Sequence, residues 1–89
     1  MIQVVKRDGE NAEFSLNKIT EAIKKAFKAT KKDYNNEILE LLSLRVTADF
    51  QDKMKEGMIS VEEIQDSVEH VLEQTGYTDV AKAYILYRK

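Results

Sequence analysis

Three basic side chains and one serine near the start of the chain have the types and spacing of an anion-binding site. Lys6 and Arg7 directly precede Asp8-Gly9, a dipeptide typical of tight turns. Ser15 and Lys18 follow where an amphipathic helix is expected to begin, and the first backbone N–H groups of a helix favour anions. Because cations and free N–H groups would converge there, the cluster predicts a phosphate site.

Lys6 gives the strongest reason to expect an anionic ligand. Alternate residues of a strand share one face, so Ile2, Val4 and Lys6 are expected to point the same way. If the apolar pair covers the helices, the Lys6 ammonium lies beneath the sheet too, where an unpaired charge is costly. The alternative is that the cations are surface charges of a hairpin, paired with neighbouring carboxylates.

No catalytic or metal-binding constellation accompanies this cluster. The chain has no cysteine, and its one histidine, His70, lies in a helical pattern without an obvious ligand partner. The carboxylates fall mostly on polar helix faces, and no nucleophile turn or glycine-rich phosphate loop is present. We therefore expect a domain that is not an enzyme and that has no catalytic or metal-ligating residues.

The charge is distributed unevenly along the 89 residues. Residues 1–32 carry eight Lys and Arg against four Asp and Glu, whereas residues 33–89 carry six against twelve. A basic first third favours an anionic ligand, but nucleic acid as a partner is not expected because its binding needs a longer basic surface. No apolar run approaches the roughly 20 residues of a membrane span, and no secretory signal is evident, so a cytoplasmic location is expected.

The N-terminal half predicts a hairpin followed by two helices. Residues 2–14 are strand formers around the turn at Asp8-Gly9. Ser15 is expected to cap a helix that runs to about residue 29 with one apolar face. A second helix is expected over residues 35–55. Its apolar stripe includes Leu41 and Leu44 and is broad enough to place the helix at the centre of a bundle.

The C-terminal half predicts a short strand and two more helices. Met58-Ile59 can form the strand, and Ser60 with Glu63 has the spacing of a capping box that opens the third helix. Gly76 is expected to end that helix. The fourth helix is expected to bury residues from Val80, Ala81, Tyr84, Ile85 and Tyr87. The element order is β-β-α-α-β-α-α, in one domain spanning residues 1–89.

Four segments in this order resemble the ATP-cone domain, the N-terminal allosteric module of ribonucleotide reductases. They are VVKRDG (4–9), FSLNKI (14–19), ISVEEIQDSVE (59–69) and VAKAYILYR (80–88). The resemblance covers essentially the whole chain. It implies an α+β fold, a four-helix bundle capped by a small three-stranded mixed β-sheet, which agrees with the element order above.

The resemblance also implies a ligand and the residues that hold it. ATP as activator and dATP as inhibitor, with Mg²⁺, would compete for one site and control a ribonucleotide reductase. Phosphate contacts would come from Lys6, Arg7, Lys18 and Lys89, with Ser15 at the helix start. Val5 and Ile19 would contact the base, and Val61 and Gln65 would contact the nucleoside. Glu63 would discriminate ATP from dATP. The implied partners are the catalytic domain or subunit of the reductase and other copies of the cone.

Three positions depart from the family pattern. Ala12 stands where some members have a glutamate that contacts adenine, Ser15 replaces a commoner Asp or Asn, and Val61 replaces a commoner threonine. These changes affect the expected base and ribose contacts more than the phosphate contacts.

Several alternatives stay open on this evidence. The domain could be a degenerate cone that acts only as a protein-interaction module, for which Ala12 and Val61 argue. The cone of a nucleotide-responsive transcriptional repressor is disfavoured, since the zinc ribbon expected before it needs cysteines. Among hosts, the anaerobic ribonucleoside-triphosphate reductase is favoured, and the chain could be an excised domain or a stand-alone cone.

Overall fold

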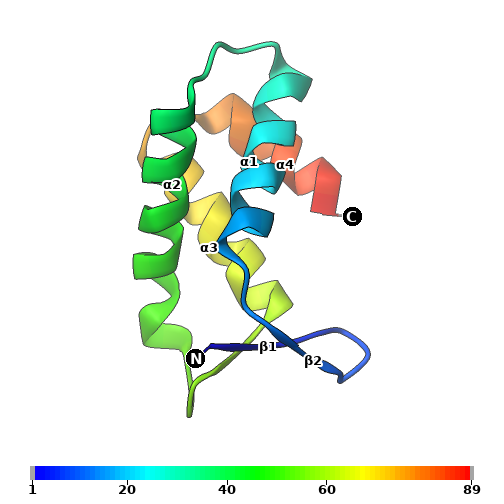
Figure 1. Cartoon of the computed structure of the whole chain (residues 1–89). Helices are drawn as coiled ribbons and strands as arrows, with labels where there is room; N and C mark the ends of the chain where they lie inside the picture. Colours follow the sequence, from blue (N-terminus) through cyan, green and yellow to red (C-terminus); the bar gives the residue numbers. More distant parts are fainter. Residues whose placement is uncertain (1, 89) are drawn as a thin grey trace.

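A small mixed sheet lies across one end of the helices in the computed structural model, which describes residues 2–88 (Figure 1). The predicted element order and α+β class are confirmed. The elements are β1 (Gln3–Val5), β2 (Asn11–Glu13), α1 (Leu16–Thr30), α2 (Asn36–Asp49), the 3₁₀ helix η1 (Phe50–Lys53), β3 (Met58–Ser60), α3 (Val61–Gln74) and α4 (Thr78–Arg88).

The sheet has the strand order β2-β1-β3. β1 runs antiparallel to β2 and parallel to β3, with Val4 aligned to Ala12 on one side and to Ile59 on the other. The hairpin closes as predicted at Gly9, whose φ of 87° lies in the left-handed region that glycine adopts freely. Gly9 N donates to Lys6 O at 2.9 Å, so this turn determines where Lys6 leaves the strand.

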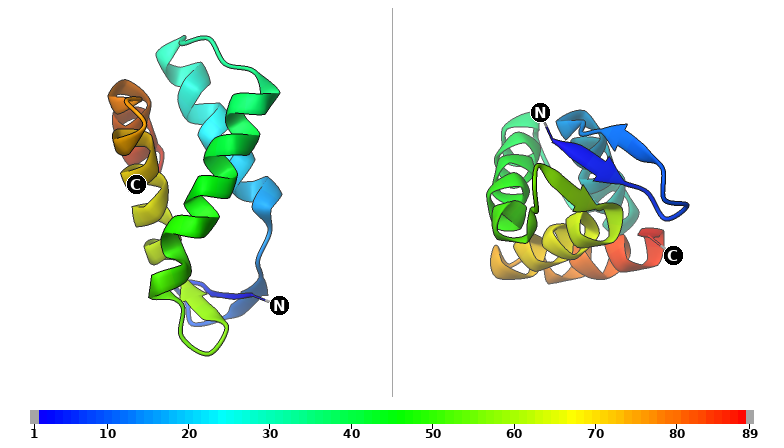
Figure 2. Two further views of the ribbon diagram at one scale, coloured as in Figure 1. Left: turned by 90° about the vertical axis from the view of Figure 1, so that its left-hand side faces the viewer. Right: turned by 90° about the horizontal axis from the view of Figure 1, so that it is seen from below.

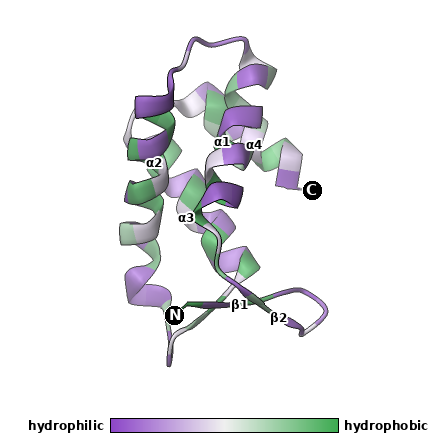
Figure 3. Ribbon diagram, in the orientation of Figure 1, coloured by the Kyte–Doolittle hydropathy of each residue, from purple (hydrophilic) through white to green (hydrophobic). Residues whose placement is uncertain are grey.

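The four helices form a ring in which each packs against two neighbours. α1 contacts α2 and α4, and α3 contacts the same two helices from the other side (end-on view in Figure 2). Each helix contributes apolar residues to the core (ribbon coloured by hydropathy in Figure 3), and the largest fully buried side chains include Phe27, Phe50, Ile23 and Leu72. Ile2 and Val4 pack against this core, which seats the sheet on the bundle.

The second helix differs from the prediction in its end and in its burial. It stops at Asp49, and η1 leads into a turn in which Glu56 and Gly57 both have positive φ, so that β3 can reverse and pair with β1. The side chains of Leu41 and Leu44 are 57% and 52% exposed, so the predicted central position is wrong. Hydrophobic periodicity located the helix but did not reveal that only α1 and α3 cover it.

The predicted capping box at the start of α3 is confirmed. Glu63 N donates to Ser60 Oγ at 3.0 Å, and Ser60 N donates to Glu63 Oε1 at 3.1 Å. The other end of α3 also follows the prediction, because Gly76 has a φ of 90° and Tyr77 N donates to Leu72 O at 2.8 Å.

Replacing Ser60 by alanine should lower the free energy of unfolding by about 1 kcal/mol, since the first turn of α3 then loses its side-chain acceptor. Urea denaturation followed by circular dichroism measures the change. Ser60→Thr, which keeps a hydroxyl acceptor, should retain most of the parent stability. Equal stability of parent and Ser60→Ala would show that this cap contributes little.

Candidate functional site

A cavity of about 290 Å³ opens between the hairpin, α1, α3 and α4. Its walls come from all four elements, which the fold brings together at the sheet end of the bundle. The lining residues are Val4, Lys6, Ala12, Glu13, Phe14, Ser15, Lys18, Ile19, Ala22, Val61, Ile64, Gln65, Val68, Tyr84 and Tyr87.

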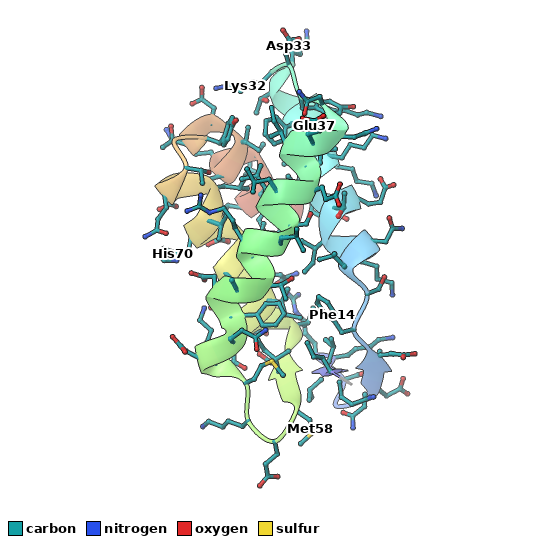
Figure 4. The ribbon with its side chains drawn as sticks, turned by 60° about the vertical axis from the view of Figure 1, so that its left-hand side comes forward. Phe14, Lys32, Asp33, Glu37, Met58 and His70 are labelled. Carbon is teal, nitrogen blue, oxygen red and sulfur yellow. The ribbon has the colours of Figure 1, made fainter. Side chains whose placement is uncertain are left out.

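The inner part of the cavity is apolar. Ile19 from α1 and Ile64 and Val68 from α3 are buried core residues that also form its surface. Phe14 lies between the sheet and the helices (Figure 4) and packs edge-on against Phe50, with ring centroids 5.6 Å apart. Such a surface suits a flat ligand group with little charge.

The rim of the cavity is polar and carries the predicted cations. Val4 and Lys6 both line it, but β1 ends at Val5 and the Lys6 side chain is exposed, so the expectation that its ammonium is buried beneath the sheet is wrong. The Lys6 and Lys18 side chains are exposed, as is Glu13, which brings a negative charge to the same rim. An anionic group bound at the rim would therefore be close to two lysines.

The N-terminus of α1 also opens at this rim. Ser15 holds the N-cap position with extended backbone angles (φ −130°, ψ 113°), but its side chain forms no capping hydrogen bond. The prediction that its hydroxyl caps the helix is therefore wrong. Lys18 N donates to Ser15 O at 3.2 Å, so the N–H groups of Leu16 and Asn17 and the Ser15 hydroxyl are the donors that a ligand at the rim could use.

Arg7 lies just outside the cavity and joins the hairpin to α3. Its Nη2 donates to Gln65 Oε1 at 3.3 Å, and its Nε is 3.7 Å from Glu62 Oε1. Both charged side chains are more than half exposed, so this ion pair is weak and can exchange for another anion. Arg7 also borders a second, shallower hollow, which it shares with Glu69, Ile85 and Arg88.

The structure brings most of the predicted site residues together. Those that line the cavity are Lys6, Ser15, Lys18, Ile19, Val61 and Gln65. Val5 does not line it, because strand alternation places it on the opposite face of β1 from Val4. The Glu63 carboxylate also lies elsewhere, held by Ser60 N in the capping box. Lys89 is outside the described residues.

Two tyrosines of α4 line the cavity and were not predicted as site residues. Tyr84 is 3% exposed, as expected for the core, but Tyr87 is 52% exposed, so its predicted burial is wrong. Their rings lie 6.1 Å apart. Two tyrosines spaced three residues apart on a helix are a signal for one shared face, but the sequence does not reveal what that face borders.

The remaining polar clusters hold the bundle together. Arg88 pairs with Asp66 and Glu69. Burial alone would lower the pKa of Arg88, but the hydrogen bonds that it donates to Glu69 and Asp66 raise it. His70 is exposed on α3 (Figure 4), with its Nδ1 2.9 Å from Asp49 Oδ1. Among residues 2–88, no group of acidic or histidine side chains is arranged to hold a metal ion. In the same range, no helix has the length and apolar character of a membrane span.

The chain is a small α+β domain with a cavity whose interior is apolar and whose rim carries two lysines. The chain belongs to the ATP cone domain family, whose model matches residues 2–89.

Relatives of this domain occur in ribonucleotide reductases of different classes. The chain is 43% identical to part of the ribonucleoside-diphosphate reductase subunit alpha of Chlamydia pneumoniae, over 100% of this chain and 9% of the relative. It is 47% identical to part of the vitamin B12-dependent ribonucleoside-diphosphate reductase of Thermoplasma acidophilum, over 98% of this chain and 12% of the relative. It is also 38% identical to part of the anaerobic ribonucleoside-triphosphate reductase of Haemophilus influenzae, over 96% of this chain and 12% of the relative.

The chain thus spans only about a tenth of the length of these relatives. The relatives include the anaerobic class that the sequence favoured as host, together with diphosphate reductases.

Proposed function

We propose that this domain binds ATP or dATP in the cavity and thereby regulates a ribonucleotide reductase. The observation that carries the proposal is the arrangement of the cavity in a member of the ATP cone family. Its apolar interior can receive the base, while Lys6 and Lys18 at its rim can bind the phosphates. Mg²⁺ would arrive with the nucleotide, bound to phosphate oxygens and water.

The phosphate end of the site is supported by electrostatics. The N-terminus of α1 at Ser15 adds backbone N–H donors beside Lys18, and a bound anion relieves the unfavourable placement of that cation in the first helical turn. Arg7 lies next to the rim, where a phosphate can displace the exposed Glu62 carboxylate from it. This exchange would loosen the link between the hairpin and α3 when nucleotide binds.

Regulation requires that ATP and dATP stabilise different states of the domain. The two ligands differ by one ribose hydroxyl, and a ligand shifts an equilibrium only by its differential affinity for the two states. The domain itself is not the catalyst in this proposal. It would act in the cytoplasm on the catalytic domain or subunit of its reductase, and through association with other copies of the cone.

Calorimetric titration of the domain with ATP, dATP and GTP in the presence of Mg²⁺ tests the proposal. We expect micromolar, adenine-selective binding. Absence of binding at millimolar nucleotide would instead support a cone that acts only as an interaction module. Size-exclusion chromatography with and without dATP tests self-association separately: an earlier elution with dATP supports it, and an unchanged elution volume contradicts it for the domain alone.

A further inference from the structure

One buried polar side chain faces the cavity from α4. Tyr84 is 3% exposed and lines the cavity, whereas the other polar lining residues are exposed or half-buried. Its hydroxyl forms no hydrogen bond with the residues that the structure describes. In the same part of the chain, every polar side-chain atom that is sealed from solvent has a hydrogen-bond partner. The hydroxyl is therefore accessible, and the residue that carries it lines the cavity.

The surroundings of Tyr84 make it a neutral hydrogen-bond donor. Burial raises the pKa of Tyr84 to about 12, although the nearby Arg88 opposes the shift, so the phenol is protonated at neutral pH. The hydroxyl is not sealed from solvent, so water at the cavity can accept its hydrogen bond. A ligand that displaces this water has to supply an acceptor in its place.

The arrangement of the cavity indicates which part of a nucleotide reaches this hydroxyl. The cations Lys6 and Lys18 are exposed at the rim, where the phosphates would remain hydrated and paired. Ile64 and Val68, like Tyr84, are buried residues that line the cavity, and their apolar surface suits the flat face of a base. From the hairpin, Ala12 offers the cavity no polar side chain.

We propose that Tyr84 recognises the base of the bound nucleotide, donating a hydrogen bond from its hydroxyl to a purine ring nitrogen. The proposal rests on the proposed function, because it requires that the cavity binds a nucleotide. Tyr84 is then a specificity-determining residue contributed by α4, while the phosphate contacts come from the hairpin and α1. Tyr87, whose ring lies 6.1 Å from that of Tyr84, also lines the cavity.

The test compares ATP with inorganic tripolyphosphate, which has the phosphates but no base. By calorimetry with Mg²⁺, Tyr84→Phe should weaken ATP binding about three- to tenfold, the effect of one hydrogen bond. The same variant should bind tripolyphosphate within about twofold of the parent. Tyr77→Phe is the matched control: Tyr77 packs on Phe27 with centroids 5.2 Å apart and does not line the cavity, so both affinities should be unchanged.

Deaza analogues of ATP identify the acceptor atom. If N1, N3 or N7 accepts the hydrogen bond, replacing that nitrogen by C–H should weaken binding to the parent and leave binding to Tyr84→Phe unchanged. Analogues that weaken both proteins equally would overturn the proposal.

The outcomes separate this proposal from the proposed function. If Tyr84→Phe binds ATP as tightly as the parent does, Tyr84 does not recognise the base, and the proposed function is unaffected. Equal weakening of ATP and tripolyphosphate assigns Tyr84 a supporting role in the fold and overturns the proposal. A parent that binds neither ATP nor dATP overturns both proposals together.

Discussion

Lys6→Ala and Lys18→Ala should each weaken the binding of ATP with Mg²⁺ by about 1.5–3 kcal/mol, the range for hydrogen bonds to charged groups. Both lysines lie at the rim of the cavity, one from the hairpin and one from the first turn of α1. Each variant removes one cation from the place where the triphosphate is proposed to bind. The measurement is calorimetric titration with ATP and with tripolyphosphate, and both ligands should lose affinity together.

Lys28→Ala is the matched control for Lys18→Ala. Lys28 is exposed in the last turn of the same helix, away from the cavity, and its loss changes the net charge by the same amount. Its ATP affinity should stay within about twofold of the parent, since exposed charges beyond a Debye length of about 10 Å are largely screened. If Lys6→Ala and Lys18→Ala bind like this control, the phosphates are not held at the rim.

Replacing Phe50 by alanine should lower the free energy of unfolding by about 3–5 kcal/mol, the usual cost of truncating a buried phenylalanine. Phe50 is 0% exposed at the junction of α2 and η1, and its ring packs edge-on against Phe14, which lines the cavity. The change removes core volume beneath the site. Because small domains have only about 5–15 kcal/mol of stability, the loss should be evident in urea denaturation.

Two further variants test whether the loss of stability is specific to the buried Phe50 ring or follows from any truncation of a side chain in this region. Leu44→Ala truncates a side chain that is 52% exposed on α2 and should change stability by no more than about 0.5 kcal/mol. Phe50→Leu keeps much of the volume and should cost about 1–2 kcal/mol, which leaves a folded protein for titration with ATP. Equal losses for Phe50→Ala and Leu44→Ala would contradict the observed packing.

Several features of the fold could be predicted because they depend on residues close together in the sequence. The turn at Gly9 needs a residue that tolerates positive φ, and the capping box needs Ser60 and Glu63 three positions apart. The alternation expected along the first strand likewise placed Val4 and Lys6 on one side, and both line the cavity although the strand ends at Val5.

Other features could not be predicted because they depend on which elements become neighbours. Leu41 and Leu44 extend the apolar stripe of α2 in the sequence, but no helix covers them. The Ser15 hydroxyl has the right position for a cap, yet its side chain forms no such bond.

The sequence by itself determined the order of the elements, the location of the basic cluster and the family, because backbone propensity, side-chain alternation and charge are local properties. Only the tertiary structure decided that the hairpin, α1, α3 and α4 enclose one cavity and that Tyr84 lies inside it. The physical reason is that a cavity is a shared property of elements far apart in the chain. Tyr84 and Lys6 line the same cavity although they are 78 positions apart in the chain, and no local pattern in the sequence specifies that they meet there.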